Sequence, residues 1–138
     1  MTLHEFLALP HRFRWGGQTG DDCTTFCATW AAELTGVDPA EDLRGTYRDA
    51  EGAHGILSKA GGIIPFMAGR LATLGFKSTA AAADGDIGVV LAPVGVGEDF
   101  KKIGAIRFGP MWAMLAPAGV VARRVECVAA WRWEGEKT

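Results

Sequence analysis

The segment that decides the fold runs from Trp15 to Gly36 and reads WGGQTGDDCTTFCATWAAELTG. It joins a glycine-rich loop to two aspartates and then to a segment with helical periodicity. Asp21 or Asp22 can accept hydrogen bonds from the free N–H groups of a helix N-terminus, and Gly36 can end the helix. Apolar residues recur at steps of three and four and predict one buried helix face: Cys23, Phe26, Cys27, Trp30 and Leu34.

The rest of the first half also predicts helices. Thr2 can cap a short helix that ends near Leu9, before Pro10. Asp38 and Pro39 predict a short turn of helix, because proline suits the first helical position. Two further helices are expected over residues 47–60 and 65–74, ended by the glycines at 61–62 and 75.

The second half predicts strands. Short apolar segments at 87–92, 103–109, 111–116, 120–126 and 128–134 are separated by Gly and Pro, and residues 93–99 form a glycine-rich loop. Such spacing is typical of an antiparallel meander. Helices followed by strands indicate an α+β fold, with a helical N-terminal half and a C-terminal antiparallel sheet.

Composition restricts the class of protein. The chain has 138 residues, which indicates a single domain over 1–138. A net charge of -2 predicts no nucleic-acid surface. No apolar run is long enough for a membrane span, and residues 1–15 show no secretory signal pattern. Three cysteines argue against a disulfide framework and fit folding in the bacterial cytoplasm.

Cys23 is the candidate nucleophile. It opens the helix after Asp22, where unpaired N–H groups and the helix dipole favour a thiolate. Gly16 and Gly17 would let the backbone approach a substrate closely, and Trp15 could line a groove beside them. We therefore assign Trp15, Gly16, Gly17 and Asp22 as candidate substrate-binding residues. The alternative is that Cys23 simply begins the apolar stripe as an inert core thiol.

No partner for this thiol is evident from the sequence. A general base must lie within hydrogen-bond reach, and the three histidines are His4, His11 and His54. Each is more typical of a surface or satisfied histidine, and His54 stays as a weak candidate base. Cys23 and Cys27 are one turn apart, but zinc needs three or four ligands, so no metal or cofactor is predicted.

Aromatic residues are abundant, with five tryptophans in the chain. Four lie within helix or strand patterns and are expected to be in the core or half-buried: Trp30, Trp112, Trp131 and Trp133. Trp15 is the exception because it adjoins the loop.

The pattern Trp15-Gly16-Gly17, then Asp22-Cys23 and Phe26, resembles the signature of NlpC-type (NlpC/P60) cell-wall peptidases. The resemblance implies a papain-like architecture, in which a helical half carries the nucleophile and an antiparallel sheet carries the base. Gly85-Asp86 and the segment IGAIRFGPMWAML resemble the blocks that follow in that family. In active relatives a histidine begins the strand that reads IGAIRFG here, and Ile103 or Lys102 takes its place. The residue that orients the histidine is also missing, because the next strand reads MWAML.

The arrangement WGG, DC, TGVDPA, RGTY, GG, GDI and AWRW is more closely similar to a small phage and prophage family encoded among tail genes. This resemblance implies a degenerate, inactive NlpC-type domain that is a structural component of a phage tail, in the tip or hub region. Its partners would be other tail proteins, and its location the virion tail. The alternative is an active cysteine amidase or peptidase that cleaves peptidoglycan peptides during phage entry, with Cys23 as nucleophile. A third possibility is an intracellular regulator that uses the same fold to bind a peptide.

Overall fold

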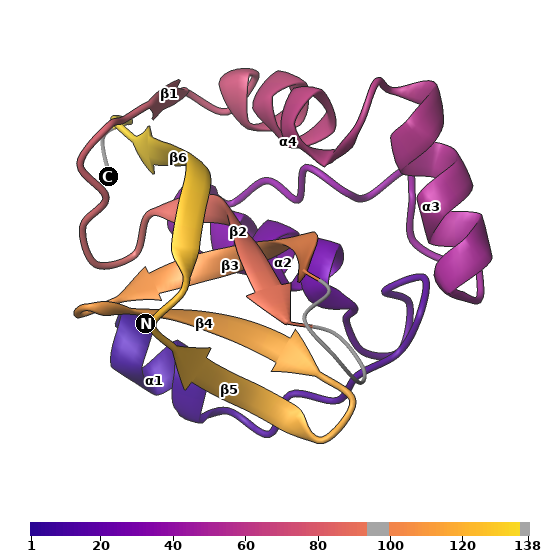
Figure 1. Cartoon of the computed structure of the whole chain (residues 1–138), viewed down its shortest axis with the longest axis horizontal. Helices are drawn as coiled ribbons and strands as arrows, with labels where there is room; N and C mark the ends of the chain where they lie inside the picture. The colour runs from indigo at the N-terminus through magenta and orange to yellow at the C-terminus, as the bar shows by residue number, and fades with distance from the viewer. Residues whose placement is uncertain (94–99, 136–138) are drawn as a thin grey trace.

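The computed structural model describes residues 1–93 and 100–135 and contains four helices and one six-stranded sheet (Figure 1). The expected α+β class, with helices first and strands after, is confirmed. The helices are α1 (Leu3–Ala8), α2 (Cys23–Thr35), α3 (Ala50–Lys59) and α4 (Ile63–Ala72). The strands are β1 (Phe76–Ser78), β2 (Ile87–Pro93), β3 (Phe100–Phe108), β4 (Met111–Ala116), β5 (Gly119–Arg123) and β6 (Glu126–Trp133).

The sheet has the order β1-β6-β2-β3-β4-β5, and every neighbouring pair is antiparallel. Strands β2 to β5 follow the expected meander, but β6 does not continue it. It returns to pair with β2, and the short strand β1 lies outside β6. This placement gives β2 a hydrogen-bonded neighbour on both sides. Val89 and Val90 are fully buried, so their backbone N–H and C=O groups need such partners.

The helix ends follow local capping chemistry. Thr2 caps α1 in a capping box with Glu5, and Asp22 caps α2, which ends at Gly36 in the left-handed conformation (φ 82°). Helix α3 begins at residue 50, three residues later than expected, because Asp49 takes the cap position and accepts a hydrogen bond from the Gly52 N–H.

Two other expectations in the helical half need correction. Residues 39–45 form turns and no helix, with the Asp38 carboxylate accepting a hydrogen bond from the Ala40 N–H. Helix α4 begins at Ile63, two residues before the expected start at Pro65. Proline is tolerated there because N–H groups in the first helical turn have no intrahelical partner. The expected loop over 93–99 lies outside the described residues, apart from Pro93, which ends β2.

The helices cover one face of the sheet, and α2 makes the central contacts with β3. Trp30 of α2 is 3% exposed, and its indole N–H donates to the Gly85 carbonyl oxygen at 2.8 Å. This bond fixes α2 to the residues just before β2. The expected core or half-buried positions of these tryptophans are confirmed, since Trp30, Trp112 and Trp131 are buried and Trp133 is half-buried.

The opposite face of the sheet carries a second, smaller apolar cluster. Trp112 on β4 reaches across β3 to β2, and a Cβ atom on Gly88 would lie 2.6 Å from its ring. Gly88 therefore makes room for the indole. The sheet thus has a helix-covered face and a self-packed face, the latter being the one that carries this second cluster.

Strands β3 and β4 pair only near the turn that joins them, from Ile106 to Phe108 opposite Met111 to Ala113. Beyond this point β3 stays with β2, and β4 stays with β5. Figure 1 shows the two strands separating toward their far ends. This separation gives the sheet an opening near the start of α2.

Candidate functional site

Cys23 lies in a cleft where β3 and β4 separate beside the first turn of α2. The cleft has a volume of about 580 Å³. It is lined by Phe13, Trp15, Cys23, Ala92, Lys101, Ile103, Met114, Leu115, Ala116, Pro117, Val121 and Arg123. The structure therefore brings Trp15 and Cys23 together, as the sequence predicts.

Strand β3 supplies the wall of the cleft next to the thiol. Ile103 and Lys101 line it, whereas Lys102 does not, because neighbouring residues of a strand point to opposite faces. A Cβ atom on Gly104 would lie 3.0 Å from the Cys23 carbonyl oxygen, so the strand backbone passes close to the helix start. Of the two residues expected in place of the family's histidine, Ile103 is the one in this cleft.

Asp22 organises the residues around Cys23 and is 1% exposed. One carboxylate oxygen accepts hydrogen bonds from the Thr24 N–H at 3.1 Å and the Thr25 N–H at 2.9 Å. The other accepts from the Gly16 N–H at 3.3 Å and from the Tyr47 hydroxyl. A single buried carboxylate thus joins the helix start, the glycine loop and the segment before α3.

The glycines of the loop pack against this network. Gly16 has φ 92°, and a Cβ atom on it would lie 2.2 Å from the Tyr47 carbonyl oxygen. Gly17 has φ 66°, and a Cβ atom there would lie 2.7 Å from the Thr25 side chain. Both glycines are buried. Their positive φ angles and close contacts give them a structural role, which sequence reasoning did not assign.

Arg44 holds the loop from the other side. Its guanidinium bonds to Asp21 at 2.8 Å, to Asp38 at 2.6 Å and to the Gly17 carbonyl oxygen at 2.7 Å. Burial alone would lower the pKa of Arg44, but the bonds to Asp38 and Asp21 outweigh it and raise the pKa. Arg44 therefore stays charged and fixes the loop to the turns at 39–45.

Burial raises the pKa of the Cys23 thiol above its ordinary value of 9.0, and the nearby charge of Asp22 raises it further. The positive charge of Lys101 opposes this effect without overcoming it. Tyr47 behaves in the same way, since burial and its bond to Asp22 raise its pKa. Of the two interpretations of Cys23, these surroundings favour the protonated, unactivated thiol.

None of the histidines lines the cleft. His11 donates from Nε2 to the Phe6 carbonyl oxygen at 2.6 Å and packs edge-on against Phe26. His54 is exposed on α3, with Ser58 as its neighbour at 3.3 Å, and Figure 1 shows α3 at the outer side of the molecule. His54 is therefore not brought beside Cys23.

His4 stacks on Phe108 with ring centroids 6.4 Å apart. Phe108 lies at the far end of β3, about 17 Å from Ile103 at the rise of an extended strand. His4 is thus also remote from the cleft.

The cysteines form no metal site in the part of the chain that the structure describes. Cys27 is 2% exposed, and its thiol donates to the Cys23 carbonyl oxygen at 3.7 Å. Within the described ranges, no group of three His, Cys, Asp or Glu side chains could hold a metal ion. Over the same residues, no helix has the length and apolarity needed to cross a membrane.

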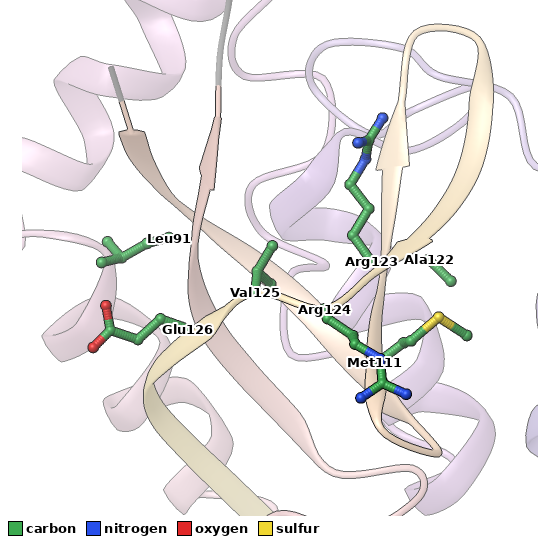
Figure 2. A pocket seen from close by; sticks show the side chains of 7 residues that line it. All are labelled: Leu91, Met111, Ala122, Arg123, Arg124, Val125 and Glu126. Carbon is green, nitrogen blue, oxygen red and sulfur yellow. The ribbon is translucent and has the colours of Figure 1, made fainter. Parts of the chain in front are cut away.

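Another hollow lies between the end of β5 and the start of β6 and has a volume of about 820 Å³. Figure 2 shows its lining side chains, among them Arg123, Arg124, Leu91 and Glu126. Arg123 and Arg124 point in opposite directions, and Leu91 and Glu126 lie on the other side of the opening. Because these groups do not converge on a common point, the hollow carries no functional assignment.

Three residues of the site were not predicted from the sequence: Tyr47, Arg44 and Lys101. The first two bond to residues far away along the chain, and only their position in the RGTY segment could have singled them out. Lys101 was missed because the sequence pattern placed the start of its strand at residue 103, whereas β3 begins at Phe100.

Comparison with known proteins gives one match. The sequence profile of a family described as a domain of unknown function (DUF6950) matches residues 2–133. No curated protein and no solved structure matches the chain.

Replacing Asp22 with alanine should destabilise the protein far more than replacing Asp49, although both aspartates cap a helix. Asp49 is exposed, so Asp49→Ala should cost about 1 kcal/mol. Asp22→Ala also leaves the buried Gly16 N–H and Tyr47 hydroxyl without an acceptor, so the expected cost is about 3 kcal/mol or more. Urea unfolding of both variants measures the difference. Equal losses would show that the Asp22 network adds nothing to an ordinary cap.

The Cys23 thiol should react slowly at neutral pH. Since its pKa lies above 9.0, about one per cent or less should be thiolate at pH 7, and alkylation should accelerate as the pH passes 9. Iodoacetamide labelling followed by peptide mass mapping reads each cysteine separately, with exposed Cys127 as the internal comparison. A half-maximal rate near pH 7 or below would contradict this assignment.

Proposed function

The chain belongs to the DUF6950 family, and we propose that it is a non-catalytic, NlpC-like domain that serves as a structural component of a phage or prophage tail, in the tip or hub region. One observation supports the non-catalytic part of this proposal. Cys23 lies in an open cleft, but the β3 wall beside it presents Ile103 and Lys101 in place of a base.

A cysteine hydrolase needs a thiolate and a group that can take and return a proton. Isoleucine has no titratable group, and lysine is protonated near neutral pH. Burial and the charge of Asp22 further favour the neutral thiol. The cleft thus contains a thiol where a nucleophile would lie, but no side chain that would deprotonate it.

A papain-like architecture is part of this proposal. In support, the thiol begins a central helix that packs on the sheet, and the strand expected to carry the base contacts that helix. The order of helices before strands agrees with the same architecture.

The assignment to a tail rests on the resemblance of the motifs from WGG to AWRW to a family encoded among tail genes. The proposed partners are therefore other tail proteins. A structural role also fits the Asp22 and Arg44 networks, which hold the loop beside Cys23 in one conformation.

One observation favours the alternative of an active amidase or peptidase on peptidoglycan peptides. Cys23 lines a cleft of about 580 Å³ together with Trp15, where a peptide could reach the thiol. A base would then have to come from another chain, because none of this chain's histidines lines the cleft.

Introducing a histidine on β3 tests whether residue 103, and not residue 102, faces the Cys23 thiol. Ile103→His places an imidazole in the cleft and should lower the pKa of Cys23, so that alkylation at pH 7 accelerates at least about tenfold. Lys102→His is the matched control, since Lys102 is exposed and does not line the cleft. Equal rates in both variants and in the parent protein would show that Cys23 and β3 do not form the remnant of a catalytic pair.

The tail assignment predicts that the protein is a constituent of purified particles. Mass spectrometry should detect it in particles induced from the host that carries the gene, and Cys23→Ala should enter particles and support infection at the parental level. Absence from particles would overturn the tail role. Particles that contain the Cys23→Ala protein but fail to infect would favour the enzymatic alternative.

A further inference from the structure

A third hollow, a cavity of about 430 Å³, lies on the self-packed side of the sheet, away from Cys23. It is formed by the connection after β1 and by residues of β3, β4 and β6. The lining residues are Thr79, Ala80, Ala81, Ala82, Arg107, Trp112, Cys127, Val128, Ala129 and Ala130. Most of these side chains are small, and Arg107 carries the one permanent charge among them.

Arg107 has no protein counter-ion in the described part of the chain. Its side chain makes no hydrogen bond or ion pair with the described residues. The nearby carboxylate of Asp86 is already occupied, since it pairs with Arg132 at 2.9 Å. A half-buried guanidinium without an anion is unusual, because removing a charge from water is costly unless it is paired.

Trp112 lies opposite Arg107 on the paired strand, and it also has a buried N–H group without an acceptor. The guanidinium carbon of Arg107 is 5.4 Å from the centroid of the Trp112 ring. The Nε–H of Arg107 and the indole N–H of Trp112 are both buried, and neither has an acceptor among the described residues. By contrast, the indole N–H groups of Trp30 and Trp133 donate to carbonyl oxygens at 2.8 and 3.0 Å.

We propose that this cavity binds a monocarboxylate on a small aliphatic or peptide body. The Nε and a terminal nitrogen of Arg107 form the fork that pairs with both oxygens of a carboxylate. The Trp112 ring, whose indole N–H also lacks an acceptor, has its centroid 5.4 Å from the guanidinium carbon. One carboxylate would thus supply both the missing counter-ion and acceptors for the two unpartnered donors.

The lining favours a carboxylate over a phosphate. A phosphate dianion has three exposed oxygens and is usually held by several cations or by backbone N–H groups. Among its lining side chains, this cavity offers one cation, the Arg107 guanidinium, and its other donors are the Trp112 indole, the Thr79 hydroxyl and the Cys127 thiol. The body of the ligand would lie against the alanine residues at 80–82 and 129–130. Two sources share this chemistry, a free aliphatic acid and the C-terminus of a peptide.

The indole N–H of Trp112 provides a direct test by ¹H–¹⁵N NMR, with its signal assigned from Trp112→Phe. The probes are hexanoate and acetyl-alanyl-alanine, each compared with its uncharged amide. We expect one or both acids to shift this signal saturably, with a Kd of about 1 mM or tighter, while the Trp30 signal stays in place. Hexanoate alone would identify an aliphatic acid, and the peptide alone a peptide C-terminus.

Arg107→Gln should weaken this binding at least about tenfold. Arg124→Gln is the matched control, because Arg124 is exposed and lies outside this cavity. If Arg107→Gln does not fold, the comparison of acid with amide on the parent protein decides the question. Equal shifts with acid and amide, no saturable shift with either acid, or tighter binding of inorganic phosphate would each overturn the proposal.

Discussion

The buried carboxylate of Asp22 is the interaction on which the helical half depends. It begins α2 by accepting from Thr24 and Thr25, and it holds the glycine loop and Tyr47 against that helix. A buried charge of this kind is stable only when its oxygens are fully hydrogen-bonded. The packing around Asp22 also requires glycine at position 16, because a side chain there would collide with the Tyr47 backbone.

The same carboxylate opposes activation of Cys23 by the helix start. The free N–H groups that could stabilise a thiolate are directed at Asp22, so much of the positive potential at the N-terminus is already neutralised. Asp22 adds a negative charge next to the thiol, and burial acts in the same direction. A histidine beside the thiol could reverse this balance, but β3 presents Ile103 there. The structural role of Asp22 and the missing base thus both favour an inert thiol.

Local chemistry made much of the fold predictable. The Thr2 and Asp22 caps, the end of α2 at Gly36 and the apolar stripe through Trp30 depend on residues close together in sequence. The place of β6 beside β2 was not predictable in this way, because strand order depends on which edges must be covered. The three residues of β1 show no pattern of their own. Within the site, Cys23 and Trp15 were predicted, whereas Tyr47 and Arg44 act over 25 and 27 residues.

The partial pairing of β3 with β4 accounts for the separation between the cleft beside Cys23 and the cavity beside Arg107. Where β3 and β4 stay paired, Arg107 and Trp112 lie together on the self-packed side, and both side chains line the cavity beside β6. Where the same two strands separate, the sheet opens toward Cys23. Ligand binding in the cavity beside Arg107 needs no reaction at Cys23. The proposed carboxylate binding therefore does not depend on Cys23.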